Sequence, residues 1–210
     1  MIAGPPPASP APAVALLTEL TAYAEHEPAL DRRLWARPLV PEHDTDLLWT
    51  WMQRPHVAEF WEMAWPRDWI GDYLRGQVDD DARTPYLGFV DETPIGYLEV
   101  YDPSRDVLGA HAPVRPGDLG AHVLIGDEEN LGRYSVALGR ATVRMLFRRP
   151  GVLRIVGEPD VRNENFLSLL AFLGFRKDSE IDLPDKRAAF MVCERADFER
   201  LASRRRRVTR

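Results

Sequence analysis

Short runs of apolar residues, some alternating with polar ones, recur along the chain between proline, glycine and acidic residues. This pattern predicts β-strands. The predicted strands cover residues 34–39, 86–90, 95–101, 119–125, 152–156, 175–182 and 188–193. The second and third of them are joined by the turn-forming sequence Asp-Glu-Thr-Pro at residues 91–94, which predicts a β-hairpin.

Apolar residues spaced three and four positions apart predict helices between these strands. The clearest pattern covers residues 130–147, a second covers 163–173 and ends at Gly174, and a weaker one covers 14–30. A glycine suits a helix end because it adopts the left-handed conformation without steric cost. This order of helices and strands predicts the α/β class, with a central mixed sheet flanked by helices.

A further helix is predicted after Asp44 or Thr45, because either residue can cap its first turn. It should end before Pro55, since the residue preceding a proline is pushed out of the helical region. The side chains expected on its apolar face are Leu47, Leu48 and Trp51. The six tryptophans of the chain are Trp35, Trp49, Trp51, Trp61, Trp65 and Trp69. Two interpretations stay open, since large rings either pack in a core against a second helix or line a pocket for part of a substrate.

The length of 210 residues predicts one domain with extensions. Residues 1–13 hold five of the eighteen prolines and bury too little apolar surface to order themselves, which predicts a disordered arm. Residues 203–210 hold five arginines and no acid, so they form a basic tail and leave residues 14–202 as the domain. The chain carries 27 basic and 33 acidic side chains, a net charge of −6, and without the tail 22 basic ones remain, a net of −11.

The acidic domain argues against a nucleic-acid partner, because such binding depends on basic side chains that neutralise phosphates. No apolar stretch reaches the roughly 18 residues of a membrane span, and the N-terminus lacks the basic-then-apolar pattern of a signal peptide. The lone Cys193 excludes an intramolecular disulfide and suits a reducing compartment. We therefore expect a cytoplasmic protein without nucleic-acid or membrane partners, either a monomer or a dimer.

The motifs of several common enzyme classes are absent from the sequence. There is no phosphate-loop lysine, dinucleotide fingerprint, zinc-ligand spacing or Gly-x-Ser-x-Gly elbow. The histidines are scattered, and no two have the helical spacing of metal ligands: His26, His43, His56, His111 and His122. These observations disfavour hydride-transfer and serine-hydrolase chemistry, and we expect no metal.

Residues 117–147 combine a predicted strand, a polar turn and a predicted helix. The turn, residues 127–133, presents the first amides of the helix, and Gly132 permits a ligand to approach the backbone closely. Free amides and the positive end of the helix dipole favour a phosphate or pyrophosphate. Arg133 and Arg140 are placed to add charged hydrogen bonds.

Four stretches carry a resemblance to a known family: WMQRPHVAEFWEMAWP (residues 51–66), PIGYLEVYDP (94–103), GDLGAHVLIGD (117–127) and EPDVRNENFLSLLAFLGF (158–175). With matches from about Trp35 to Phe198, the chain resembles the Gcn5-related N-acetyltransferase (GNAT) superfamily. Within it, the chain is most similar to the siderophore-biosynthesis branch, which comprises hydroxylysine and hydroxyornithine N-acyltransferases. The third stretch is the most specific, because this branch carries a histidine in that strand and His122 occupies its place.

The resemblance implies the GNAT fold and an acyl-CoA co-substrate, with acetyl-CoA as the favoured donor. It places the pyrophosphate at the start of the helix and the pantetheine along the preceding strand. The residues that it assigns to the cofactor are Leu124, Ile125, Gly132, Arg133, Tyr134, Ser135 and Asn165. The pyrophosphate loop of the superfamily reads Gln/Arg-x-x-Gly-x-Gly/Ala, whereas here Tyr134 replaces the second glycine. A large side chain at this position is tolerated where it points away from the cofactor.

Acyl transfer to nitrogen needs a group that takes up a proton and donors for the thioester oxyanion. With the resemblance, the near-neutral pKa of an imidazole makes His122 the expected base. Asp160 is expected either to orient that imidazole or to hold the cationic nitrogen of the acceptor, and its alternative role is to cap the next helix. Backbone amides around Leu124 and Ile125 are the expected oxyanion donors. The residues expected on the acceptor side are Arg54, His56 and Trp61.

Three functions are compatible with these residues. The first is an acyl-CoA-dependent N-acyltransferase that acts on N-hydroxylysine, N-hydroxyornithine or a related hydroxylated amine and forms a hydroxamate for a siderophore. The second is an aminoglycoside 6′-N-acetyltransferase, whose polycationic substrates suit an acidic domain. The third is a non-catalytic acyl-CoA-binding module, which Tyr134 in the pyrophosphate loop would favour. No covalent intermediate is required, so Cys193 is expected to be a buried strand residue.

Overall fold

The computed structural model describes residues 21–208, with side chains as far as residue 201. Its centre is one eight-stranded sheet in the order β1-β2-β3-β4-β5-β6-β8-β7. The strands are β1 (Tyr23–Glu27), β2 (Arg32–Pro38), β3 (Arg83–Val90), β4 (Thr93–Tyr101), β5 (Asp118–Ile125), β6 (Arg154–Gly157), β7 (Arg176–Asp182) and β8 (Arg187–Glu194). Neighbouring strands are antiparallel except β5 and β6, which are parallel, so the sheet is mixed as predicted.

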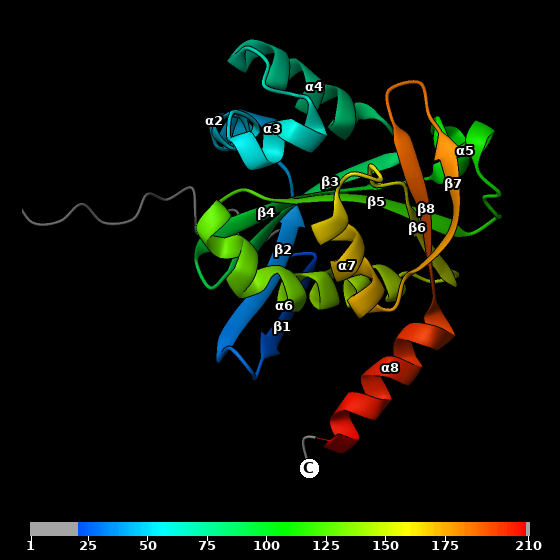
Figure 1. Cartoon of the computed structure of the whole chain (residues 1–210). Coiled ribbons are helices and arrows are strands. Elements are labelled where there is room, and N and C mark those ends of the chain that lie inside the picture. The colour runs from blue at the N-terminus through cyan, green and yellow to red at the C-terminus, as the bar shows by residue number, and fades with distance from the viewer. Residues whose placement is uncertain (1–20, 209–210) are drawn as a thin grey trace, which may run out of the picture.

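Helices cover both faces of the sheet (Figure 1). The helices are α2 (Pro41–Met52), α3 (Pro55–Trp61), α4 (Arg67–Asp79), α5 (Leu108–His111), α6 (Glu128–Phe147), α7 (Glu164–Leu173) and α8 (Arg195–Val208), with a 3₁₀ turn, η1 (Pro103–Arg105). The helices α2, α3 and α4 lie on one face, and α6 and α7 lie on the other. Pro41 and Pro55 each stand at the first position of a helix, where the missing amide has no partner to lose.

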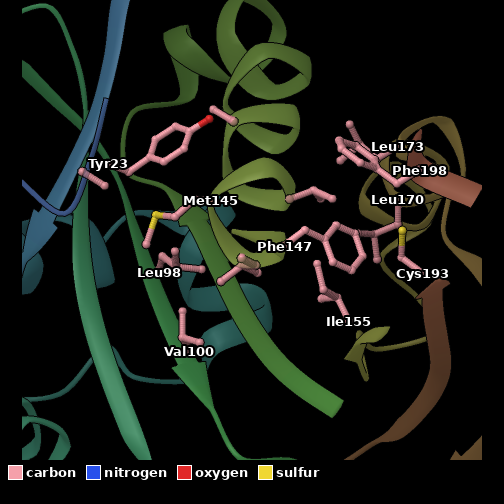
Figure 2. Close-up of a cluster of buried hydrophobic side chains, with 14 of the residues drawn as sticks. Tyr23, Leu98, Val100, Met145, Phe147, Ile155, Leu170, Leu173, Cys193 and Phe198 are labelled. Carbon is pink, nitrogen blue, oxygen red and sulfur yellow. The ribbon is translucent and has the colours of Figure 1, made fainter. Parts of the chain in front are cut away.

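Two apolar cores follow from the alternation of side chains along β4. Leu98 and Val100 face α6 and pack with Met145, Phe147 and Ile155, as Figure 2 shows. The residues between them point to the opposite face, because successive side chains of a strand alternate. On that face the helices α2, α3 and α4 bury a second apolar cluster against β2, β3 and β4. Glu99, the charged residue between Leu98 and Val100, therefore lies on this second face, close to α3 and α4.

The first element of the structure corrects one prediction. Residues 23–27 form the edge strand β1, paired with β2, so the helix expected over 14–30 is wrong there. Tyr23 is 5% exposed and the following residues alternate between more and less exposed positions, which is the period of a strand. Residues 14–20 and the arm expected at residues 1–13 lie outside the described part of the chain.

The start of α2 also differs from the prediction. The helix begins at Pro41 after Val40, so Asp44 and Thr45 lie inside it and neither is its cap. Asp44 instead accepts two hydrogen bonds of 2.7 Å from the buried guanidinium of Arg37, and one of 2.8 Å from the amide of Val40. A buried guanidinium needs such a partner, and this need outweighs the capping preference of aspartate.

The tryptophans differ in burial. Trp35 and Trp51 pack in the core between α2 and the sheet, as the first interpretation expects, whereas 63% of Trp69 is exposed; a pocket lined by tryptophan stays a prediction. At the other end of the chain, α8 continues through residue 208, so the backbone of most of the basic tail extends this helix. Among residues 21–208, no helix is long and apolar enough to cross a membrane.

Candidate active site

The strand β5 is paired with β4 from Gly120 to Ile125 but with β6 only along its first three residues, Asp118 to Gly120. The parallel ladder ends where Gly120 faces Val156, while the ladder with β4 continues to Ile125. The second half of β5 therefore has one backbone edge that β6 does not cover. This split in the sheet leads directly to the start of α6 at Glu128.

Only alternate residues of β5 direct their backbone groups toward the uncovered edge. Gly126 donates its amide to a carbonyl of β4 at 2.8 Å, so Leu124, two residues earlier, faces β4 as well. Val123 and Ile125 face the uncovered edge, where the Ile125 carbonyl lies 3.1 Å from Nε2 of His56. Of the two amides expected to meet an acyl group, that of Ile125 points to the uncovered edge and that of Leu124 points to β4. The second amide that points to the uncovered edge is that of Val123.

His122 lies between two buried glutamates. Its Nδ1 lies 3.2 Å from Oε2 of Glu99, and its Nε2 is hydrogen-bonded to Oε1 of Glu158. Glu99 stands directly opposite His122 in the β4–β5 ladder, and Glu158 follows the last residue of β6. Both glutamates are at most 4% exposed, whereas 30% of the His122 side chain is open to solvent. His122 is therefore the member of this trio that a substrate can reach most readily.

Three tyrosines complete the hydrogen bonding of the two carboxylates. Tyr73 and Tyr97 both donate to Oε1 of Glu99, the latter at 2.8 Å. Tyr101 donates to Oε2 of Glu158 at 2.5 Å. Burial, together with the neighbouring negative charges, raises the pKa of each of these hydroxyls above its ordinary value. The tyrosines consequently remain hydrogen-bond donors at neutral pH.

The two glutamates decide the protonation state of His122. Burial lowers its pKa, but the charges and hydrogen bonds of Glu158 and Glu99 outweigh burial and raise the pKa from 6.5 to about 10. Burial raises the pKa of Glu158, yet the charge and hydrogen bond of His122 lower it to about 2. At neutral pH the site thus holds an imidazolium between two carboxylates. In this state His122 has no free lone pair to take up a proton, and the role of base stays a prediction for this residue.

The helix α3 lies over His122 and connects the site to the start of α6. Trp61, its last residue, presents its ring edge-on to His122 with the ring centroids 6.4 Å apart. His56 of the same helix contacts β5, as described above, and Arg54, which precedes α3, forms an ion pair of 2.6 Å with Asp127. The structure therefore places Arg54, His56 and Trp61 beside β5 and the turn that follows it, and their part in binding the acceptor stays a prediction.

Asp160 is engaged by a neighbouring arginine. Its two oxygens accept hydrogen bonds from Nε of Arg162 at 2.9 and 3.0 Å, and its Oδ1 accepts another from the Arg162 amide at 2.8 Å. These bonds hold the pKa of Asp160 below its ordinary value. The expectation that Asp160 orients the imidazole is corrected, because Glu158, two residues earlier, is the residue that contacts His122.

The residues predicted for the pyrophosphate lie in the first two turns of α6, which begins two residues earlier than expected. A Cβ built on Gly132 would meet nothing within 4 Å, so this backbone is open to a ligand. Tyr134 is 8% exposed and packs in the core between α6 and the sheet. The Arg133 guanidinium lies 5.1 Å from the centroid of that ring, and Ser135 donates to a carbonyl one turn earlier. The residue that departs from the family pattern thus points into the protein.

The start of α7 is capped by Asn163, whose side-chain oxygen accepts a hydrogen bond of 3.1 Å from the amide of Phe166. Asn165 lies exposed in the first turn of this helix, and its contact with coenzyme A stays a prediction.

Cys193 is fully buried in β8, as expected, and burial raises the pKa of its thiol to about 12. A thiol in this state is not a nucleophile at neutral pH.

Glu99 and Glu158 are absent from the residues predicted for the site. One signal for Glu99 is its position as the single charge in the apolar run Tyr-Leu-Glu-Val-Tyr at residues 97–101. Such a charge inside a strand needs a buried partner.

Among the residues whose side chains are described, no group of three or more His, Cys, Asp or Glu side chains is arranged to hold a metal ion.

The described geometry fits an acyl-CoA molecule. The uncovered edge of β5 offers the amides of Val123 and Ile125 to an acyl or pantetheine group, and the start of α6, which has no side-chain cap, offers a positive dipole end to a pyrophosphate. Gly132 leaves room for the ligand beside the backbone. An acceptor would reach the thioester from the face of the sheet that carries His122 and α3.

Comparison with known proteins identifies the family. Residues 40–183 match the family described as "Acetyltransferase (GNAT) domain". The chain is 30% identical to the N(6)-hydroxylysine O-acetyltransferase of Escherichia coli, over 84% of this chain and 56% of that protein. It is 28% identical to the N-hydroxyputrescine acetyltransferase of Acinetobacter baumannii, over 84% of this chain and 83% of that protein. The chain thus spans little more than half the length of the Escherichia coli relative.

A solved structure of a similar protein contains coenzyme A. The aminoglycoside acetyltransferase AAC(6')-Ib, crystallised in complex with coenzyme A, superimposes with a TM-score of 0.72 at 28% identity, over 80% of this chain and 98% of that one. Fold and site together define an acyltransferase that takes its acyl group from acyl-CoA. Within that class, the chain belongs to the GNAT acetyltransferase family. The predicted fold and co-substrate are confirmed.

Proposed function

We propose that this enzyme transfers an acyl group, acetyl in the first instance, from acyl-CoA to the nitrogen of a hydroxylated amine. The product is a hydroxamate, the bidentate oxygen ligand that a siderophore uses to bind ferric iron. The observation that carries the proposal is the position of His122 between the carboxylates of Glu99 and Glu158, which favours its protonated form. The relatives named for hydroxylysine and hydroxyputrescine support the same substrate class.

A protonated His122 favours an acceptor whose nitrogen is already neutral. An alkyl ammonium has a pKa near 10.4 and must lose a proton before it can attack a thioester. The oxygen of a hydroxylamine withdraws electron density from the nitrogen, so that this nitrogen is largely unprotonated at neutral pH. A hydroxylated amine therefore attacks without prior help from a base, and the imidazolium is free to act as an acid.

The proton transfers balance within the site. The acceptor nitrogen attacks the thioester carbon, and the amides of Val123 and Ile125 are directed to stabilise the oxyanion. When the carbon–sulfur bond breaks, the leaving thiolate takes a proton from His122, and His122 then takes the proton that the acylated nitrogen releases. Glu99 and Glu158 hold the imidazole in place and stabilise the charged form that this second proton restores. The net reaction needs no metal or redox partner.

A matrix of donors and acceptors tests the proposal. Acetyl-, malonyl-, succinyl- and long-chain acyl-CoA are each combined with N6-hydroxylysine, N5-hydroxyornithine, their unhydroxylated parents and kanamycin, and products are read by mass spectrometry. We expect turnover of the hydroxylated amines, with each parent amine slower by at least about tenfold because it arrives protonated. Turnover of parent amines and hydroxylated amines at equal rates, or of neither, would contradict the proposal.

The second candidate is an aminoglycoside 6′-N-acetyltransferase, which the fit to AAC(6')-Ib favours. The same matrix decides between the two, since kanamycin is among the acceptors. Acetylation of kanamycin alone would favour this candidate. The non-catalytic module loses its motivation, because Tyr134 is buried in the core and leaves the helix start open. The proposal includes a cytoplasmic location, which supplies acyl-CoA and keeps the Cys193 thiol reduced.

A further inference from the structure

The ring of Tyr101 lies across β5, over the backbone of Gly120. The two residues stand opposite each other in the β4–β5 ladder, so both positions project to the face that carries His122. A Cβ built on Gly120 would lie 2.3 Å from Cζ of Tyr101, and 2.4 and 2.6 Å from the two neighbouring ring carbons. No side chain therefore fits at residue 120 while the ring stays in place.

The hydroxyl of Tyr101 reaches beyond β5 to the end of β6. It donates a hydrogen bond of 2.5 Å to Oε2 of Glu158, the residue that follows Gly157 at the end of this strand. The β5–β6 ladder has ended by then, at Gly120 and Val156. This ladder does not hold Glu158 against β5, and the side chain of Tyr101 bridges the split instead.

The same ring lies against the imidazole of His122. The two ring centroids are 4.6 Å apart, and their planes are inclined by 34°. Tyr101 is 1% exposed, and the guanidinium of Arg83, paired with Asp106 at 2.5 Å, lies 5.7 Å from the centroid of its ring. A ring enclosed in this way has little freedom to turn, so it restricts the orientation of the imidazole beside it.

We propose that Tyr101 is a positioning residue for acyl transfer, and that Gly120 is required because it admits the Tyr101 ring. The hydroxyl holds Glu158 across the split, the ring restricts the imidazole, and together they keep His122 in the orientation from which it transfers protons. This inference rests on the part proposed for His122 and adds the two residues that fix its geometry.

The two glutamates differ in how many tyrosines hold them. Among the described side chains, Tyr73 and Tyr97 both donate to Glu99, whereas Tyr101 is the tyrosine that donates to Glu158. Without this hydroxyl, Oε2 of Glu158 loses its donor and the carboxylate can turn with the imidazole. A displacement of about 1 Å in a reacting group can cost about a hundredfold in rate, so a small rotation is enough to matter.

Tyr101→Phe tests the hydroxyl, because it keeps the ring and removes only the donor. Steady-state rates are measured with acetyl-CoA and N6-hydroxylysine. We expect kcat to fall about tenfold or more. The KM of each substrate should stay within about twofold, because the buried Tyr101 offers no surface to either of them.

Tyr86→Phe is the matched control. Tyr86 of β3 is also buried, and its hydroxyl accepts a hydrogen bond of 2.7 Å from Arg149, on the face of the sheet that α6 covers. Both variants remove a buried hydroxyl that contacts a charged group, so both should lower the thermal midpoint. Only Tyr101→Phe should lower kcat, which separates positioning from a structural role.

A double-mutant cycle tests the part of Gly120. Gly120→Ala places a methyl group where the ring lies, so we expect it to lower kcat in the unmodified enzyme. In the Tyr101→Leu background the ring is gone, and the same substitution should change kcat little further. An equal loss in both backgrounds would show that Gly120 does not act through Tyr101 and would overturn that half of the inference.

His122→Gln, measured alongside, separates this inference from the proposed function. We expect it to lower kcat about a hundredfold. If His122→Gln has this effect while Tyr101→Phe turns over as fast as Tyr86→Phe, the positioning role is overturned and the proposed function stands. If His122→Gln keeps the kcat of the unmodified enzyme, or if that enzyme does not acylate N6-hydroxylysine, both are overturned.

Discussion

His122 stands directly opposite Glu99 in the antiparallel pairing of β4 with β5, and its Nδ1 lies 3.2 Å from the carboxylate. Because opposite residues of two paired strands project to the same face, this contact is set by the register of the sheet. The second carboxylate, that of Glu158, approaches the other ring nitrogen from the end of β6. The protonation of the imidazole thus depends on residues from β4, from β5 and from the end of β6.

This charge makes the stability of the fold depend on pH. The pKa of His122 is about 10 in the folded protein, whereas the ordinary pKa of a histidine is 6.5. Between these two pH values the folded protein therefore binds a proton that the unfolded chain has released. Its contribution to the free energy of unfolding is fully present below pH 6.5 and is lost as the pH rises through 10.

Denaturant unfolding at pH 6, 8 and 10 measures this loss. We expect the free energy of unfolding to fall more steeply over this interval in the unmodified protein than in His122→Gln, which lacks the titrating group. The variant also controls for lysines and tyrosines that titrate near the upper end. Parallel pH dependences in the two proteins would show that His122 is not held in its charged form.

Substitution of Gly132 by alanine should raise the stability of the fold but weaken binding of the acyl-CoA donor. A Cβ at this position meets nothing within 4 Å, so Gly132→Ala should stabilise α6 by about 0.5–1 kcal/mol. The same methyl group would crowd a pyrophosphate at the helix start, and we expect the KM for acetyl-CoA to rise about tenfold. Thermal unfolding and steady-state kinetics measure the two effects.

Gly76→Ala is the matched control for this substitution. Gly76 lies within α4, and a Cβ built there also meets nothing within 4 Å. This variant should gain similar stability without a change in the KM for acetyl-CoA. If Gly132→Ala also left that KM unchanged, the donor would not approach the backbone at this point.

The Arg37–Asp44 pair is buried, with side chains 4% and 5% exposed. Asp44→Ala leaves a guanidinium in the core without its charged partner, and such a change costs about 3–5 kcal/mol of stability. Asp46→Ala, two residues along the same helix, removes an exposed ion pair with Arg67 and should leave the unfolding midpoint unchanged. Equal midpoints for the two variants in urea would contradict this assignment.

The basic tail should be dispensable for chemistry. Phe198 packs in the core, and Leu201 lies close to Gly174 at the end of α7, so a chain that ends at Leu201 keeps these contacts. We expect this truncated chain to retain turnover with acetyl-CoA and a hydroxylated amine. A strongly reduced kcat, with unchanged thermal unfolding, would assign the arginines a part in the reaction.

Much of the fold is predictable from the sequence because its strands and helices have strong periodicity. The helix ending at Phe147, the hairpin around residues 91–94 and the helix end at Gly174 all follow from local patterns. The edge strand β1 does not, because Tyr23 is its one fully buried residue and its pairing with β2 outweighs local propensity.

The site is less predictable, because its central contacts join residues far apart in the chain. His122 and Trp61 follow from the family resemblance, and the structure places them together. The contacts of Glu99 and Glu158 with His122 depend on strand register and on where β6 ends, which neither spacing nor composition reveals. Asp160 is prominent in the sequence, yet Arg162 occupies its carboxylate.

The early end of the β5–β6 ladder, at Gly120 and Val156, has a kinetic consequence. In the proposed mechanism the donor reaches the uncovered edge of β5 along α6, whereas His122 faces the opposite layer, beneath α3. On this proposal neither reactant has to leave before the other arrives, and both occupy the enzyme at once. Initial-rate lines for the two substrates should therefore intersect, and no acylated form of the enzyme should accumulate between them.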